Sequence, residues 1–119
     1  MKMTVQELYE NLGGNYNEAL GRMMKDTLVG KFAGMFVNDP SYNQLVAAMD
    51  EADAHKAFEA AHTLKGVSAN LAFSVLFEKA SAVTEALRGA DTIDGAVDLM
   101  PALTEEYNKT IAAINEFQS

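Results

Sequence analysis

The segment Ala61–Leu71 places a histidine, a lysine and a glycine on one face of an expected helix. Lys65 follows His62 by three residues and Gly66 follows it by four, the spacings at which side chains share a helix face. Neutral imidazole is a nucleophile near neutral pH because its pKa lies close to about 6.5, and a lysine ammonium supplies a point charge for an anion. Glycine inside a helix costs about 1 kcal/mol relative to alanine. The pattern therefore indicates that something must approach the histidine closely.

Helical periodicity places His62 on the side of its helix that faces away from the apolar residues. At about 100° per residue, the apolar side holds Ala57, Ala60, Ala61, Leu64, Val67, Ser68 and Leu71. The opposite side holds His55, Glu59, His62, Gly66 and Ala69, with Phe58 and Lys65 on its flank. We therefore expect an exposed imidazole above small side chains. A surface histidine without a function explains the imidazole, but it does not explain the glycine one turn later.

Metal chemistry is one alternative use of the histidine. Glu59-x-x-His62 matches the Glu-x-x-His element of di-iron four-helix bundles. That chemistry needs a second such element pointing inward, and the other histidine, His55, has Ala52 three residues before it. A weak surface site made of His55, Glu59 and His62 stays open. We expect no resident metal and no cofactor.

Covalent catalysis by another nucleophile is also disfavoured. A triad needs a base beside an activated Ser or Cys, yet Ser68 lies on the buried side and Thr63 lies off the His62 face. The chain has no cysteine, which excludes thiol catalysis. The remaining chemistry uses His62 itself, which can attack an acyl-phosphate and hold the phosphoryl group on nitrogen. Lys65 would then attract the phosphoryl oxygens, and Gly66 would leave room for a partner's carboxylate and metal ion.

Composition narrows the class of protein. The length of 119 residues predicts a single domain, 1–119, large enough to bury roughly two-thirds of its unfolded surface. A net charge of −8 disfavours nucleic acid, which is bound through Lys and Arg. The acids of the last quarter are interpreted as a solvated helix face: Asp91, Asp94, Asp98, Glu105, Glu106 and Glu116. No signal peptide and no apolar stretch of about 20 residues is present, so we expect a cytoplasmic protein without a membrane segment.

The chain predicts an all-α fold, because helical periodicity dominates and no convincing strand is found. Long helices joined by short loops predict an antiparallel four-helix bundle with short accessory N-terminal helices. Thr4 and Glu7 form a capping-box pattern, Ser41 and Asp53 are expected helix caps, and Pro101 either kinks the last helix or marks its start. The expected elements are a first helix ended by Gly13-Gly14, a segment 16–37 that breaks near Lys25-Asp26, a helix 42–50, the His62 helix, a turn 70–73, a helix 74–87, a connection 89–92 and a last helix 93–117.

The segment His62-Thr63-Leu64-Lys65-Gly66 resembles the His-x-Leu-Lys-Gly signature of histidine-containing phosphotransfer (HPt) domains. The resemblance continues into the flanking residues and reaches most of the chain: Phe58–Ala61, Asn70-Leu71, 16–24, 32–42 and 85–91. It implies a four-helix bundle in which His62 is the phosphorylated residue, Lys65 stabilises the phosphoryl group and Gly66 permits docking of a receiver domain. Such a protein is a phosphocarrier and not an enzyme. It takes the phosphoryl group from one receiver aspartate and passes it to another, while the magnesium belongs to the receiver.

The sequence departs from the family pattern at Ala72, where glycine is usual. Glycine there suits a backbone with positive φ, so we expect Asn70 to take the left-handed conformation instead. Candidate polar residues near the site on the following helix are Ser81, Thr84 and Arg88. His55 is interpreted as a solvated first-turn residue.

Two other functions stay open. The chain could be a helical adaptor that docks receivers without carrying phosphate, or the phosphoacceptor module of a larger sensor or chemotaxis kinase. A start at Met1 and an end shortly after the last helix fit a small stand-alone protein, which we expect to be a monomer. A partner surface around His62 is expected to include apolar residues of the first helix, namely Val5, Leu8 and Tyr9.

Overall fold

The computed structural model describes residues 2–119, and within that range it contains helices and no strands. The helices are α1 (Val5–Leu12), α2 (Tyr16–Met23), α3 (Asp26–Met35), α4 (Ser41–Asp50), α5 (Ala54–Asn70), α6 (Ser74–Leu87), α7 (Asp94–Val97) and α8 (Met100–Gln118), with a 3₁₀ turn η1 (Phe36–Asn38) between α3 and α4. The all-α prediction is confirmed.

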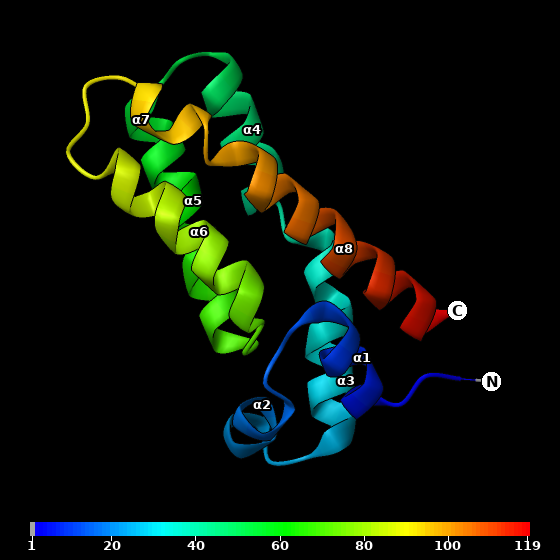
Figure 1. The fold of residues 1–119 in the computed structure, drawn as a ribbon. Helices are drawn as coiled ribbons and strands as arrows, with labels where there is room; N and C mark the ends of the chain where they lie inside the picture. The colour runs from blue at the N-terminus through cyan, green and yellow to red at the C-terminus, as the bar shows by residue number, and fades with distance from the viewer. Residues whose placement is uncertain (1) are drawn as a thin grey trace.

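Helices α4, α5, α6 and α8 form the antiparallel four-helix bundle (Figure 1). Helix α5 packs against both α4 and α6, and α8 packs against α6. The short helices α1, α2 and α3 gather at one end of the molecule, and the single turn of α7 lies at the other end (Figure 1). The result is an elongated body of 46 × 25 × 19 Å, with the accessory N-terminal helices that the sequence predicted.

The apolar face of the first helix is buried in the core. The prediction that its residues form part of a partner surface is therefore wrong. Val5, Leu8 and Tyr9 are 8%, 0% and 0% exposed, because α1 packs against α3 and α8. The Tyr9 hydroxyl donates a hydrogen bond of 2.7 Å to the carbonyl oxygen of Leu71 at the end of α5. The ring of Tyr9 also lies 5.6 Å from that of Phe73. The amphipathic stripe of α1 therefore fastens the N-terminal helices to the turn between α5 and α6.

Most of the predicted helix ends are confirmed. Thr4 and Glu7 form the capping box of α1, Gly13 closes that helix at φ +74°, and Asp53 caps α5 by accepting a 3.0 Å hydrogen bond from the backbone of Lys56. The prediction for Ser41 is wrong, because Ser41 is the first residue of α4 and Asp39 accepts hydrogen bonds from its backbone N–H and hydroxyl. The carboxylate two residues earlier therefore supplies the cap.

Two helix breaks fall where the sequence indicated. The segment from Tyr16 divides into α2 and α3 at Met24, which takes a positive φ of 74°. At the other end of the chain, Pro101 lies in the first turn of α8, where its missing N–H costs nothing. Pro101 therefore marks the start of the last helix and does not kink it.

The turn between α5 and α6 corrects the prediction for Asn70. Asn70 is the last residue of α5, and Ala72 itself takes the left-handed conformation, with φ +57°. The Ala72 carbonyl oxygen accepts a 2.8 Å hydrogen bond from the backbone of Asn15. An L-residue thus occupies a backbone conformation that glycine adopts more readily, and contacts with the N-terminal segment hold it there.

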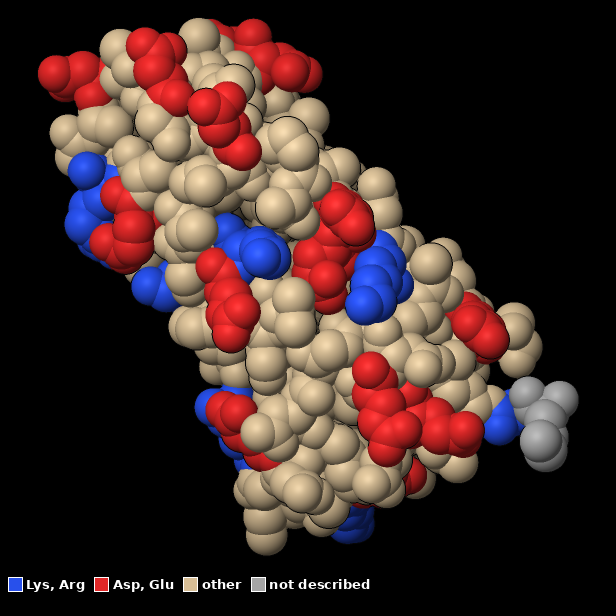
Figure 2. All heavy atoms as spheres, in the orientation of Figure 1, with Lys and Arg blue, Asp and Glu red and all other residues tan. Residues whose placement is uncertain are grey.

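On the face shown in Figure 2, the end of the molecule near α7 carries several acidic side chains and no Lys or Arg. Asp91, Asp94 and Asp98 are exposed there, as are Glu105 and Glu116 on α8. The interpretation as a solvated face holds for these five acids. It is wrong for Glu106, which is 8% exposed and whose carboxylate lies against the backbone near Gly13.

Candidate functional site

His62 lies midway along α5 and is exposed. The buried stripe of the same helix consists of Ala54, Ala57, Ala60, Ala61, Leu64 and Ser68, with Val67 half-buried, and it continues into Leu71 just after the helix. These small side chains let α5 pack between α4 and α6. The predicted orientation of the helix is therefore confirmed, and the imidazole projects from the solvent side of the bundle.

Lys65 lies beside His62, at the seam between α5 and α6. Its ammonium nitrogen Nζ is 3.8 Å from Oε1 of Glu85 on α6, and its side chain is 28% exposed. The same carboxylate accepts two hydrogen bonds from Arg88, each 3.1 Å long, from Nε and Nη2. One carboxylate thus holds two cations next to the histidine.

The Glu85 carboxylate is more acidic than usual. Hydrogen bonds from Arg88 lower its pKa, partial loss of hydration opposes that change, and the charges of Arg88, Lys65 and His62 add to the lowering. Glu85 therefore stays ionised at neutral pH. The contribution of His62 places the imidazole within the electrostatic reach of this cluster.

Phe58 connects Arg88 to the histidine. Its ring centroid is 5.8 Å from that of His62, which follows one turn later on α5. The Arg88 guanidinium carbon lies 5.2 Å from the same ring centroid, a cation–π distance. The guanidinium is thus fixed by Glu85 on one side and on the other by the aromatic ring that neighbours His62.

Gly66 leaves the surface open one turn after His62. A Cβ built on Gly66 would meet no atom within 4 Å. Packing within the chain therefore does not require glycine at this position.

An apolar groove lies further along α5, between that helix and α3. Its walls include Met23, Phe32, Met35 and Phe36 from the N-terminal half and Val67 from α5. Phe32 is 40% exposed and Met35 is 55% exposed. Exposed apolar side chains gathered in this way are typical of protein contact surfaces.

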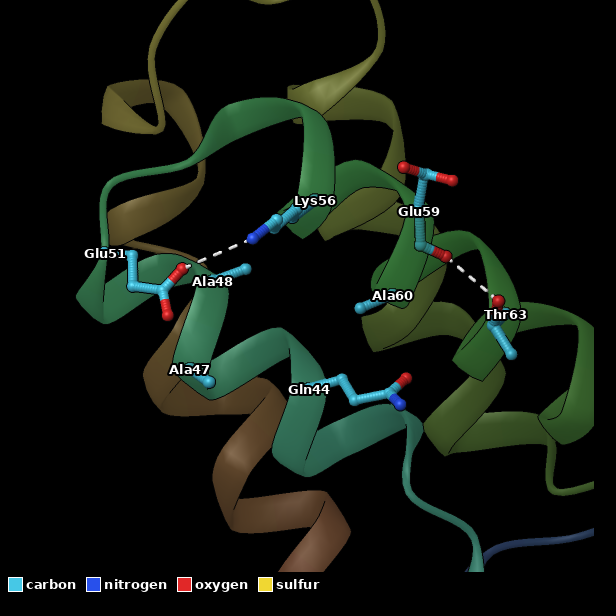
Figure 3. Close-up of a pocket in the computed structure, with 8 residues that line it drawn as sticks. All are labelled: Gln44, Ala47, Ala48, Glu51, Lys56, Glu59, Ala60 and Thr63. Carbon is cyan, nitrogen blue, oxygen red and sulfur yellow. Dashed lines mark hydrogen bonds and ion pairs between the residues drawn. The ribbon is translucent and has the colours of Figure 1, made fainter.

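The groove on the α4 side of α5 is polar and does not include His62. Figure 3 shows Lys56 of α5 directed at Glu51, 4.0 Å away at the end of α4, and Thr63 donating its hydroxyl to the carbonyl oxygen of Glu59 at 3.0 Å. Ser68 donates its hydroxyl to the carbonyl oxygen of Leu64 inside the helix. Neither hydroxyl is therefore placed as a nucleophile beside His62.

Comparison with protein families decides what kind of domain this is. The model of the Hpt domain matches residues 39–115. The chain belongs to the Hpt domain family. The match covers α4, α5, α6, α7 and most of α8, which is the bundle that carries His62. No curated protein and no solved structure matches the chain.

Hpt domains take part in histidine phosphotransfer within phosphorelays. They are phosphocarrier modules without kinase activity, and they interact with the receiver domains of response regulators. Within residues 2–119, no helix combines the length and apolar character that crossing a membrane requires.

The weak surface metal site is not supported by the arrangement of its residues. His55 pairs through Nε2 with Oε1 of Glu59 at 2.9 Å. Among the residues described, no three His, Cys, Asp or Glu side chains gather as a metal site. His55 lies exposed in the first turn of α5, as expected.

Of the three polar candidates, Arg88, just after α6, alone contacts a neighbour of His62, the ring of Phe58. Thr84 is buried and donates its hydroxyl to the carbonyl oxygen of Ala80, and the Ser81 hydroxyl is buried within α6. Glu85, which is the centre of the charged cluster, was not among the residues predicted from the sequence. Its three-residue spacing to Arg88 is a recognisable pairing signal, but its approach to Lys65 comes from the packing of α5 against α6.

Proposed function

We propose that this Hpt domain accepts a phosphoryl group on His62 from the aspartate of one receiver domain and passes it to the aspartate of another. The observation that carries the proposal is the exposed imidazole on α5, with Lys65 beside it and open space at Gly66. An attacking nitrogen needs access to a phosphorus atom held in another protein, and this arrangement provides it. We further propose that residues 1–119 act as a single-domain, monomeric, cytoplasmic protein.

In the forward step, the unprotonated ring nitrogen of His62 donates its lone pair to phosphorus. The bond between phosphorus and the receiver's aspartate oxygen breaks, and the carboxylate leaves with the electron pair. The other ring nitrogen keeps its proton. Lys65 attracts the phosphoryl oxygens as a point charge, while the receiver supplies its own carboxylates and metal ion. Transfer to the second receiver is the reverse of this step on a different aspartate.

We propose that the receiver docks over His62 and reaches the apolar groove formed by Met23, Phe32, Met35 and Val67. Val67 lies five residues after His62 on α5, which corresponds to about 7.5 Å along a helix axis. Because Val67 also lies about 140° around the helix axis from His62, a receiver that contacts both must wrap around this side of α5. Gly66, one turn after His62, leaves room for such a partner.

The test uses a receiver domain labelled with radioactive phosphate on its aspartate. Wild-type protein is expected to gain a phosphate that is labile in acid and stable in base, and His62→Gln is expected to gain none. His55→Gln is the matched control, because it removes the other histidine and should label like the wild type. Label that persists in His62→Gln, or wild type that stays unlabelled with several receivers, would contradict the proposal. Signalling retained by His62→Gln in cells would instead favour an adaptor.

A further inference from the structure

Glu85 places a negative charge where a phosphohistidine would need positive ones. Its carboxylate accepts both hydrogen bonds from Arg88, and its Oε1 also lies 3.8 Å from Nζ of Lys65. Lys65 follows His62 by three residues on α5, and Arg88 lies over the ring of Phe58, whose centroid is 5.8 Å from that of His62. Lys65 and Arg88, the cations near His62, are thus already paired with the Glu85 carboxylate.

A phosphoryl group on His62 would compete with Glu85 for the same cations. A phosphoryl group bound to a side chain carries about −1.5 to −2 charges near pH 7 and presents three acceptor oxygens. Lysine and arginine bind such oxygens through charge-assisted hydrogen bonds. Every hydrogen bond that Arg88 makes to Glu85 is unavailable to the phosphoryl group, and the carboxylate also repels it.

We propose that Glu85 is a positioning residue that withholds Lys65 and Arg88 from the phosphoryl group and thereby shortens the lifetime of phosphohistidine at His62. This inference rests on the proposed function, because it concerns the phosphorylated form of the same site. A site that held the phosphoryl group with two free cations would lose it to water more slowly.

The direction of the effect follows from the chemistry of loss to water. An oxygen of water bonds to phosphorus, the N–P bond breaks, one proton of water ends on the ring nitrogen and the other stays on the phosphate. In a loose transition state the phosphoryl group resembles metaphosphate. The electrons of the N–P bond leave with the ring nitrogen, so the charge on the phosphoryl oxygens falls from about −2 toward −1. Cations bound to its oxygens therefore stabilise the phosphohistidine more than the transition state. Releasing Lys65 and Arg88 from Glu85 should slow the reaction.

The experiment uses Glu85→Gln in a His55→Gln background, in which His62 is the remaining histidine. Phosphoramidate, a small phosphoryl donor, labels the histidine without any receiver, and the half-life of the label is followed at pH 7. We expect Glu85→Gln to lengthen the half-life by about two- to five-fold, the range that solvent-exposed charge pairs produce. The difference should shrink as salt is added, because salt screens exposed charges.

Two control variants separate this role from a general effect of charge or folding. Glu85→Asp keeps the charge and should stay closer to wild type than Glu85→Gln does. Glu116→Gln removes the same charge from the exposed end of α8 and should leave the half-life unchanged. A half-life in Glu85→Gln that equals the wild-type value, or a difference that does not respond to salt, would overturn the inference.

A double-mutant cycle tests whether Glu85 acts through the two cations. In a Lys65→Ala, Arg88→Ala background, Glu85→Gln should lose most of its effect, whereas an undiminished effect would show simple repulsion and overturn the proposed route. The outcomes also separate this inference from the proposed function. Unchanged half-lives on a labelled His62 reject the role of Glu85 alone. A His62 that takes no phosphoryl group from phosphoramidate or from receivers rejects both.

Discussion

Gly66 lies one helical turn after His62 on the exposed side of α5, with no atom within 4 Å of where its Cβ would be. Nothing inside the chain therefore requires glycine at this position. Helical backbone with open space favours alanine, so glycine lowers the stability of α5 without improving its packing. The cost is explained if a partner approaches this part of the helix.

Gly66→Ala is expected to raise the free energy of unfolding by up to about 1 kcal/mol, measured by urea denaturation. Gly66→Leu should fold but lose phosphotransfer from a receiver by about tenfold or more, the factor that 1.4 kcal/mol of interface clash produces. Gly21→Ala is the matched control, since Gly21 also lies in a helix with no atom within 4 Å of a built Cβ. It should gain stability and keep transfer. Normal receiver-dependent transfer in Gly66→Leu would contradict the docking role.

The two alanines with positive φ are expected to respond differently to substitution by glycine. Ala52 has φ +55° and is exposed, whereas Ala72 has φ +57° and is 3% exposed. Ala52→Gly relieves the left-handed backbone without losing contacts, and we expect a gain of about 0.5–1 kcal/mol. Ala72→Gly gains the same relief but loses a buried methyl group worth about 0.8 kcal/mol, so its stability should change little.

Thermal and urea unfolding of both variants measure this difference. Ala112→Gly, at an exposed position inside α8, is the control and should lose about 1 kcal/mol. If Ala52→Gly destabilised the protein as much as Ala112→Gly, the left-handed backbone would carry no strain and the explanation would be wrong.

Patterns within one helix predicted the orientation of the site, because they depend on local geometry. Periodicity along α5 was enough to place His62 outside and Leu64 inside, and the cap at Asp53 follows from hydrogen bonds over three residues. The pairing of Lys65 with Glu85 was not predictable in the same way. It depends on how far α5 is shifted along α6, and the intervening turn and the packing of both helices set that register.

The predictions that were wrong also depended on tertiary packing, which the sequence of a single helix does not determine. Val5, Leu8 and Tyr9 form an apolar stripe that fits either a partner surface or a core, and only the position of α1 against α3 and α8 decides between them. Glu106 belongs to an acidic run in the sequence, yet its place on α8 turns it toward the interior. The left-handed residue of the α5–α6 turn was assigned by residue preference, whereas contacts with Asn15 fix it at Ala72.

The apolar groove beside α5 predicts which surface variants impair docking. Phe32→Asp places a charge at an exposed aromatic of the groove, and we expect receiver binding to weaken by about tenfold or more, as truncated interface anchors do. Labelling of His62 by phosphoramidate should be unchanged, because the small donor needs no docking surface. Isothermal titration calorimetry with a receiver measures the first effect, and acid-labile label measures the second.

Val97→Asp is the control for Phe32→Asp. Val97 is 47% exposed, similar to Phe32 at 40%, but it lies on α7 at the opposite end of the molecule. It should bind receivers like the wild type. Equal weakening in both variants, or unchanged binding in Phe32→Asp, would show that the groove is not the docking surface.

The buried carboxyl of Glu106 is expected to make the free energy of unfolding depend on pH. Burial raises the pKa of this carboxyl, with Lys109 and Lys79 opposing the rise, and its Oε1 is buried without a hydrogen-bond partner. The folded state therefore binds this proton more tightly than the unfolded chain, whose glutamate pKa is about 4.3. Protonated Glu106 therefore stabilises the folded state. This stabilisation is fully present below the unfolded pKa and is lost as the pH rises through the raised pKa of the folded state.

Glu106→Gln removes the charge, and we expect it to raise the free energy of unfolding at pH 7 by about 1 kcal/mol, the scale of a buried unsatisfied group. The advantage over wild type should shrink as the pH is lowered toward 4, because wild-type Glu106 then becomes neutral. Urea denaturation between pH 4 and pH 8 measures both effects. Glu105→Gln, at the exposed neighbouring position, should change stability by less than about 0.5 kcal/mol. A gain in Glu106→Gln that did not vary with pH would show that the charge of Glu106 is not what destabilises α8.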